Sequence, residues 1–373
     1  MKNQHFSLLF AIDKGGGMGG AMETAEGTDS VLGELSGEEI QDMLDSMLGE
    51  QQFSFMDYVA QLAQGKMPVR VSEMGQEILQ GFWSNWQQHK SMYLYLLLLA
   101  VVGAVMTNLS KLLQGKQVAE TAFYGVYLLF FTLLASAFAE ASGLAAQTLT
   151  GLLDFIKVLT PTYFISMSFS QGAGASAIYY EFSLVLVMVV DYLLVRFSIP
   201  AINVFFLLKV ANELSEEEMF SKMAELISDF IKLAMKALFG VTMGINVIQG
   251  LIVPVSAQMQ NNALVKVGGS IPGVGNTIST VTSTVLCAAK LVKNAVGVAG
   301  VIAVFLLCAI PLLKLLFWRF GYQLIAAVVQ PVSDKRIIRC LGAVTESVSL
   351  LVQAVSLGAM LFILSILVVS AMT

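Results

Sequence analysis

The stretch KLVKNAVGVAGVIAVFLLCAIP, Lys290 to Pro311, decides the class of this protein. It opens on two lysines three residues apart, and twenty uncharged residues then separate Lys293 from Lys314. A bilayer core of about 30 Å requires roughly 20 apolar residues of a helix that crosses it. The stretch therefore predicts a transmembrane helix with two cations at its start.

The composition of the whole chain extends this prediction. Of its 373 residues 56% are hydrophobic and 13% are charged, whereas soluble domains carry roughly 25% charged residues. A soluble protein of this size would leave much of that apolar side-chain area facing water. We therefore expect an all-α fold, namely a polytopic bundle of helices in a membrane.

Long windows without charge recur along the chain. They are residues 91–110, 121–139, 237–265, 294–313 and 347–373, and the apolar run 182–212 is interrupted only by Asp191, Arg196 and Lys209. Each is long enough to cross a bilayer as a helix. These six runs are the clearest candidate spans, and the basic segments described below raise the expected number to about seven.

Two other uncharged windows, 158–180 and 267–289, are rich in Gly, Ser and Thr. Proline removes a backbone donor and disrupts a helix, and non-helical backbone at membrane depth must be shielded by protein. We therefore expect broken or re-entrant helices here, with polar loops outside the membrane as the alternative. The candidate helix breaks are Pro161, Pro200, Pro272 and Pro311.

Lysine and arginine near span ends mark the cytoplasmic side of a membrane protein. The basic segments are Lys111–Lys116, Lys222–Lys236 and Lys335–Arg339. If pairs of crossings separate them, all three are cytoplasmic and both termini lie outside. The second segment is amphipathic, so we expect it to lie along the membrane interface.

The first 90 residues differ from the rest. Residues 1–66 hold eleven acidic residues against three lysines. We expect residues 1–90 to form an acidic, partly flexible extracytoplasmic region and residues 91–373 to form the transmembrane domain.

An internal repeat is a further hypothesis. A shift of 111 residues places Pro161 on Pro272 and Pro200 on Pro311, and it superposes the basic segments. This spacing predicts two tandem parallel units, about 110–220 and 221–331, followed by a final span at 341–373. Chance alignment of apolar sequence is the alternative.

Residues that carry chemistry are sparse. The sequence has no phosphate-binding G-x-x-x-x-G-K-[ST] loop, and its two histidines, His5 and His89, lie far apart. Cys287, Cys308 and Cys340 lack metal-binding spacing and are expected to pack as small apolar residues. We therefore expect no catalytic residue, no metal, no cofactor and no nucleic-acid partner.

Four charges lie in or beside apolar windows: Glu181, Asp191, Lys290 and Lys293. An ion at bilayer depth is costly, so it usually faces a partner or a water-filled cavity. The lysines either pair with the two acids across the unit boundary or extend to the lipid headgroups, and both hypotheses stay open here.

Small residues follow the paired lysines. Gly297 and Gly300 give the helix a smooth face. Such a face lets two helix backbones approach closely, so we expect tight helix packing there in a bundle or an oligomer.

Leu291–Leu341 resembles the stage III sporulation protein AE family of endospore-forming bacteria. Two elements together carry the resemblance, K-N-x-V-G-x-x-G at Lys293–Gly300 and YQLIAAVVQP at Tyr322–Pro331. A looser similarity extends from about Lys90 to the C-terminus. The resemblance implies a multi-pass protein of the mother-cell membrane around the forespore.

The same resemblance implies partners and a role. The partners are the other proteins of the sporulation operon, among them an ATPase and ring-forming subunits, and the role is that of a permease-like channel subunit needed for late forespore gene expression. A homo-oligomer is a further expectation. A stand-alone secondary transporter of a small solute is the alternative function, and the missing motifs disfavour an enzyme.

Overall fold

The structure is a computed structural model that describes residues 37–48, 54–63, 87, 90–105, 116–171, 173–214, 219–268, 275–331 and 333–371. These residues are almost entirely helical and include no strand. The helices are α3 (Gly37–Leu48), α4 (Phe55–Ala63), α6 (Lys116–Gln171), α7 (Ala173–Val190), η2 (Asp191–Ser198), α8 (Ile199–Leu214), α9 (Ser221–Gly268), α10 (Gly275–Val329), α11 (Lys335–Ala371) and a shorter apolar helix at Lys90–Val105. The prediction of an all-α membrane-type bundle is confirmed.

The number of spans differs from the prediction. Five helices in the described part of the chain are long and apolar enough to cross a membrane: Tyr124–Ser168, Ser176–Glu213, Ser221–Leu251, Lys290–Val329 and Lys335–Ala371. Seven spans are therefore not confirmed. At 1.5 Å per residue the 56 residues of α6 measure about 84 Å, so the bundle must extend beyond a core of about 30 Å.

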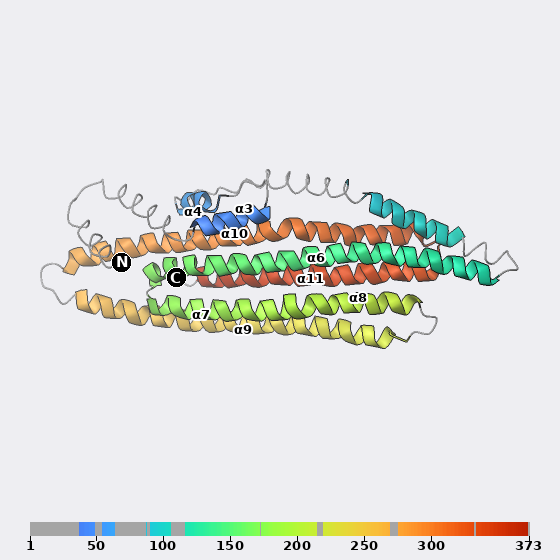
Figure 1. Ribbon diagram of the computed structural model, residues 1–373. Coiled ribbons are helices and arrows are strands. Elements are labelled where there is room, and N and C mark those ends of the chain that lie inside the picture. The colour runs from blue at the N-terminus through green and yellow to red at the C-terminus, as the bar shows by residue number, and fades with distance from the viewer. Residues whose placement is uncertain are drawn as a thin grey trace.

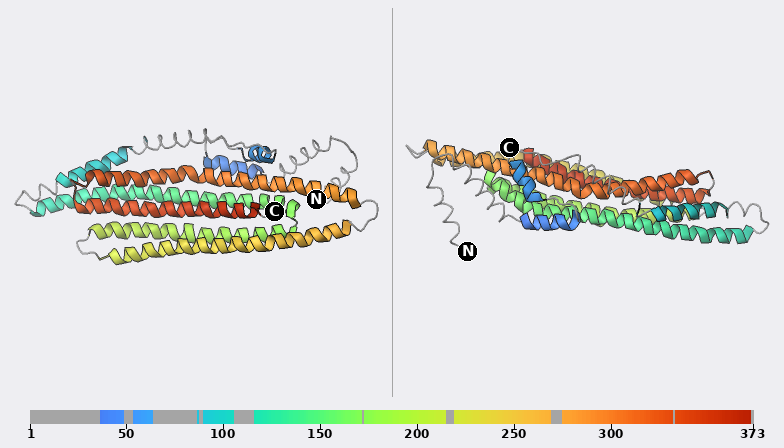
Figure 2. Two further views of the ribbon diagram at one scale, coloured as in Figure 1. Left: turned by 180° about the vertical axis from the view of Figure 1, so that it is seen from behind. Right: turned by 90° about the horizontal axis from the view of Figure 1, so that it is seen from above.

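The long helices run antiparallel in an elongated bundle (Figure 1). Viewed from behind, they follow the order α10, α6, α11, the α7–α8 helix and α9 (Figure 2). Helix α11 is central because it packs on α6, α8, α9 and α10. Many of its apolar side chains are buried, and Val344, Val348 and Leu351 are wholly inaccessible to solvent.

One end of the bundle collects two of the three basic segments, Lys222–Lys236 and Lys335–Arg339, and of the first segment only Lys116, where α6 begins, is a described residue. The start of α6, the end of α8, the start of α9, the end of α10 and the start of α11 all lie there (Figure 1). We call this the charged end, and the opposite end, where α6, α9 and α11 finish, the far end. The segment Lys222–Lys236, which was expected along the membrane interface, is instead the first part of the continuous helix α9.

The proline predictions are corrected by these helices. Pro161 and Pro311 lie inside the unbroken helices α6 and α10, because packing against neighbouring helices compensates for the one backbone bond that a proline removes. Pro200 is the second residue of α8 and follows η2, a π-helical segment in which Ile199 N–H donates to Leu194 O. The wider π turn relieves crowding before the proline. Pro272 lies outside the described residues.

The windows expected to be re-entrant are helix ends. Residues 158–171 complete α6, and residues 173–180 begin α7. In the second window α9 ends at Gly268 and α10 begins at Gly275. Each window therefore holds the end of one long helix and the start of the next, which is the place of a connection between antiparallel helices rather than of a re-entrant segment.

The 111-residue repeat is not confirmed. Residues 116–214 and 221–329 each hold two antiparallel stretches of helix in the same order, but any up-and-down bundle would give that order. The packing of the two pairs differs. Helix α6 lies against α7, whereas α9 and α10 lie on opposite sides of the bundle and scarcely touch (Figure 1).

Part of the N-terminal region docks on the bundle. Helices α3 and α4 pack on α6 and α10 through Ile40, Leu44, Phe55 and Val59, which are wholly buried. The side-chain oxygen of Gln41 accepts the backbone N–H of Phe55 at 2.9 Å and so joins the two short helices.

Candidate functional site

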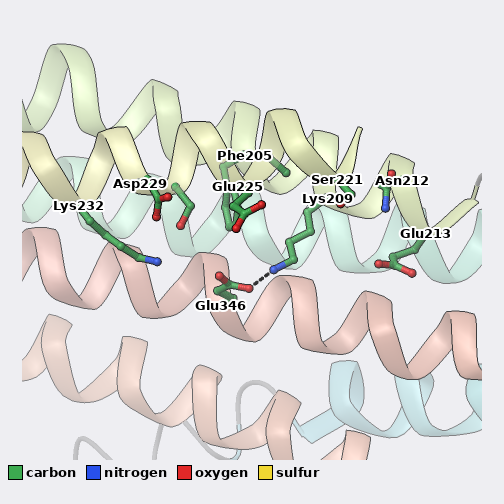
Figure 3. A pocket seen from close by; sticks show the side chains of 11 residues that line it. Phe205, Lys209, Asn212, Glu213, Ser221, Glu225, Asp229, Lys232 and Glu346 are labelled. Atoms are coloured by element: carbon green, nitrogen blue, oxygen red, sulfur yellow. Dashed lines mark hydrogen bonds and ion pairs between the residues drawn. The ribbon is translucent and has the colours of Figure 1, made fainter. Parts of the chain in front are cut away.

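A polar pocket opens at the charged end between α8, α9 and α11 (Figure 3). Its volume is about 440 Å³. The side chains that line it, which we call the charged pocket, are Phe205, Lys209, Asn212, Glu213, Ser221, Ala224, Glu225, Ser228, Asp229, Lys232 and Glu346.

Helical spacing explains why these residues face one space. Lys209, Asn212 and Glu213 stand at i, i+3 and i+4 on α8, so they share one face. On α9 the polar residues from Ser221 to Lys232 recur with the same spacing. The two polar faces converge where the helices reach the charged end.

Two ion pairs join α8 to α11 at this pocket. Lys209 Nζ contacts a carboxylate oxygen of Glu346, the interaction drawn in Figure 3, and it also lies 5.3 Å from the centre of the Phe205 ring. Arg339 Nε donates to Glu213 at 2.6 Å, and the Glu213 side chain is only 13% exposed. These contacts hold α8 and α11 in register.

A hydrogen bond fixes the turn between α8 and α9. The side-chain oxygen of Asn212 accepts the backbone N–H of Phe220 at 2.9 Å. Asn212 is itself buried. The pocket is therefore a shaped polar surface; among the described residues no group of three His, Cys, Asp or Glu side chains has metal-binding geometry.

The sequence does not predict this pocket. In the sequence Lys209 only interrupts an apolar run, and Arg339 only belongs to a basic segment. The partners Lys209 and Glu346 are 137 residues apart in the chain. No periodicity within one helix indicates such a pair.

The Lys209–Glu346 pair is expected to couple measurably. A double-mutant cycle of Lys209→Met and Glu346→Gln, measured by unfolding, should give a coupling free energy of about 0.5–1 kcal/mol. The value is modest because the two side chains are 32% and 40% exposed, so solvent screens their charges. The charge swap Lys209→Glu with Glu346→Lys should recover most of the loss in melting temperature caused by Lys209→Glu.

Lys222 and Glu225 provide the matched control for this cycle. They pair at 3.2 Å on one helix with 92% and 62% exposure, so their coupling should not exceed about 0.5 kcal/mol. Equal coupling in the two cycles would contradict a role for the Lys209–Glu346 pair in joining the helices.

Lys293 is wholly buried near the far end of the bundle. Its Nζ donates to the backbone oxygen of Val369 at 3.4 Å, in the last turn of α11. The final carbonyl groups of a helix lack partners within it and carry a partial negative charge. Through this contact Lys293 stabilises the end of α11.

The other candidate charges lie elsewhere. Lys290 and Glu181 are exposed, and Asp191 accepts a hydrogen bond from Arg196 at 3.0 Å within η2. Helix α7 is not among the elements that pack closely on α10. The hypothesis that the lysines pair with these two acids is therefore wrong for this structure, because the helices that carry them are not neighbours.

Gly297 and Gly300 lie where three helices meet. A Cβ on Gly297 would overlap Ser370 Oγ of α11 and would lie 3.3 Å from Tyr163 Oη of α6. A Cβ on Gly300 would lie 2.9 Å from Leu159 Cδ2. The Tyr163 hydroxyl and Ser370 Oγ are hydrogen-bonded at 3.0 Å, so both glycines face close helix contacts.

Comparison with known proteins identifies similar sequences. Residues 53–373 match the family model described as stage III sporulation protein AE. Stage III sporulation protein AE of Bacillus subtilis (strain 168) is 26% identical over 275 residues, which cover 74% of this chain and 69% of that protein. No solved structure matches the chain.

Proposed function

The chain belongs to the stage III sporulation protein AE family, and on that premise we propose that it is the permease-like membrane subunit of the channel complex that links mother cell and forespore. In this role it is a multi-pass protein of the mother-cell membrane around the forespore. It sustains late forespore gene expression as part of that complex and performs no catalysis itself.

The observation that carries the proposal is the family match over residues 53–373. The five long apolar helices support it, because a subunit that forms the membrane part of a complex needs several spans. The family is one of sporulation membrane proteins rather than of known enzymes.

The charged end is the proposed docking side for the ATPase of the complex. It carries the basic segments, which in membrane proteins favour the cytoplasmic side, and an ATPase requires cytoplasmic nucleotide. The charged pocket offers carboxylate, ammonium and hydroxyl groups at this end. The ring-forming partners are then assigned to the far end, in the intermembrane space.

This orientation predicts cysteine accessibility. In a background without the native cysteines, we expect Met219→Cys and Ser333→Cys, both at the charged end, to react with an impermeant thiol reagent only from the cytoplasm. Ala371→Cys, at the far end, should react only from outside. Labelling of Met219→Cys and Ser333→Cys from opposite sides would contradict the proposed topology.

A homo-oligomer is part of the same proposal. The outer face of α9 exposes large apolar side chains at alternating spacings of four and three residues, the pattern of helices that pair side by side. They are Met223, Leu226, Phe230 and Leu233, and Met219 in the turn before α9 precedes them at the same spacing. A second copy of α9 is the partner that we propose for this stripe.

The proposed role is tested by purification of the tagged protein from sporulating cells. We expect the ATPase and ring-forming proteins of the operon to co-purify with it, and the subunit number of the complex to report the homo-oligomer. A stand-alone transporter would instead purify without them and move a small solute in liposomes by itself. That result would overturn the proposed role.

A further inference from the structure

The inner face of α9 carries a row of three buried polar side chains, Thr242, Asn246 and Gln249. Their spacing of i, i+4 and i+7 places them on one face of the helix. Their exposed fractions are 0%, 2% and 2%. Thr242 Oγ1, both amide atoms of Asn246 and Oε1 of Gln249 have no hydrogen-bond partner among the described residues. We call these three residues the amide row.

The elements that pack on α9 bury mostly apolar side chains. Helix α9 packs on α7, η2, α8 and α11, whose buried positions include Val187, Val190 and Leu194. On α11 one further polar group has the same character, because Ser365 is 8% exposed and its Oγ also has no partner there.

Buried polar atoms without partners need an explanation. Native proteins contain few of them, and each costs free energy compared with an apolar side chain of the same shape. A helix whose inner face served packing alone would carry Leu or Val at these positions. The cost is offset when a small polar molecule in the interior accepts and donates the missing hydrogen bonds.

The chemistry of the row defines what it binds. A hydroxyl and two carboxamides both donate and accept hydrogen bonds and carry no charge. Such a set suits uncharged hydrogen-bonding molecules, because it carries no charge that would neutralise a buried ion. We propose that the amide row is a hydrated site inside the bundle that binds small uncharged hydrogen-bonding molecules, namely water or a neutral polar solute.

An apolar segment separates the amide row from the charged pocket. Ser228 lines the pocket, is 4% exposed and also has an unpartnered Oγ. Between Ser228 and Thr242, about 21 Å along α9, the buried positions are Ile231, Met235 and Leu238. For a molecule that enters from the charged end this segment is the barrier, and the flexible side chain of Met235 is its adaptable part.

This inference deepens the proposed function and rests on it for its purpose, since a channel subunit needs a hydrated interior. The site itself is tested separately, by the reactivity of cysteines with a small water-soluble methanethiosulfonate. The probe requires water at the thiol, because the thiolate is the reactive form. The protein is the full chain in membranes, with Cys287, Cys308 and Cys340 replaced by alanine.

We expect Asn246→Cys and Gln249→Cys to react at least tenfold faster than Val304→Cys. Val304 is the matched control, because it is wholly buried on α10, a helix that scarcely touches α9. Asp229→Cys, exposed in the charged pocket, is the fast reference. Rates for Asn246→Cys and Gln249→Cys as slow as that for Val304→Cys would overturn the site.

The melting temperature provides a second test in case the cysteine variants fail to fold. If the row is dry, Asn246→Leu removes a buried unsatisfied amide and should raise the melting temperature of the purified protein; that rise would also overturn the site. We expect no rise. Two measurements on proteoliposomes separate water from solute. Osmotic shrinkage in sucrose reports the passage of water, and reswelling in urea or glycerol reports the passage of the solute. Both are made for the native chain and for Asn246→Leu.

The barrier has its own test. Met235→Ala should speed the labelling of Asn246→Cys several-fold from the charged end, and Met235→Phe should slow it; equal rates would overturn the barrier. The outcomes are distinguishable from those for the proposed function. A dry amide row in a protein that still co-purifies with its operon partners overturns only the site, and a hydrated row in a protein that purifies alone overturns only the channel role.

Discussion

Replacing Lys293 by glutamate is expected to abolish accumulation of the folded protein, whereas Lys290→Glu should leave it near the native level. The Lys293 side chain is wholly buried and its Nζ contacts the last turn of α11. A carboxylate there would meet the negative end of the helix. A buried ion without compensating contacts costs several kcal/mol, a large part of the roughly 5–15 kcal/mol that stabilises a typical protein.

Lys290 is the matched control for this prediction. It lies one turn earlier on the same helix and is exposed, so its charge stays solvated in either form. The measurements are the amount of each variant in the membrane fraction and the melting temperature of what can be purified. Equal behaviour of the two variants would contradict the role given to Lys293.

Second-site changes separate this role from the ion pairing suggested by the sequence. Asp191 already pairs with Arg196, and Glu181 is exposed on a helix that does not pack closely on α10. Adding Asp191→Lys or Glu181→Lys to Lys293→Glu should therefore restore nothing. Recovery in either double variant would show that the lysine neutralises an acid after all. Unchanged accumulation of Lys293→Gln would indicate instead a lysine that merely reaches the headgroups.

Gly297→Ala is expected to lower stability, whereas Gly143→Ala should raise it. The methyl group at position 297 would overlap Ser370 Oγ, which the Tyr163 hydroxyl holds in place. Overpacking of this kind costs about 1–3 kcal/mol. Nothing lies within 4 Å of a Cβ at Gly143 on α6, so there the change gains the roughly 0.5–1 kcal/mol of helix propensity that glycine lacks.

A compensating change identifies the cause. Ser370→Gly removes the atom that the new methyl group would meet, so Gly297→Ala with Ser370→Gly should recover part of the melting temperature. The thermal transitions of the detergent-purified variants provide the measurement. A loss of stability at position 143 as large as that at 297 would contradict the close packing seen at the junction of α6, α10 and α11.

The sequence by itself determined the membrane class, the all-helical architecture and the common end of the basic segments Lys222–Lys236 and Lys335–Arg339. These properties follow from local composition, because about twenty apolar residues suffice to specify a span. It also predicted close packing at Gly297 and Gly300, where the structure brings α6 and α11 against α10. Each of these features depends on residues that lie close together in the sequence.

Only the tertiary structure decided which residues meet. The register between helices distant in the chain sets the pairing of Lys209 with Glu346 and the contact of Lys293 with the end of α11, and hydropathy does not encode that register. The prolines show the same limit. A rule for an isolated helix predicts a break at Pro161 and Pro311, but packing on neighbouring helices outweighs one lost backbone bond, so α6 and α10 continue through them.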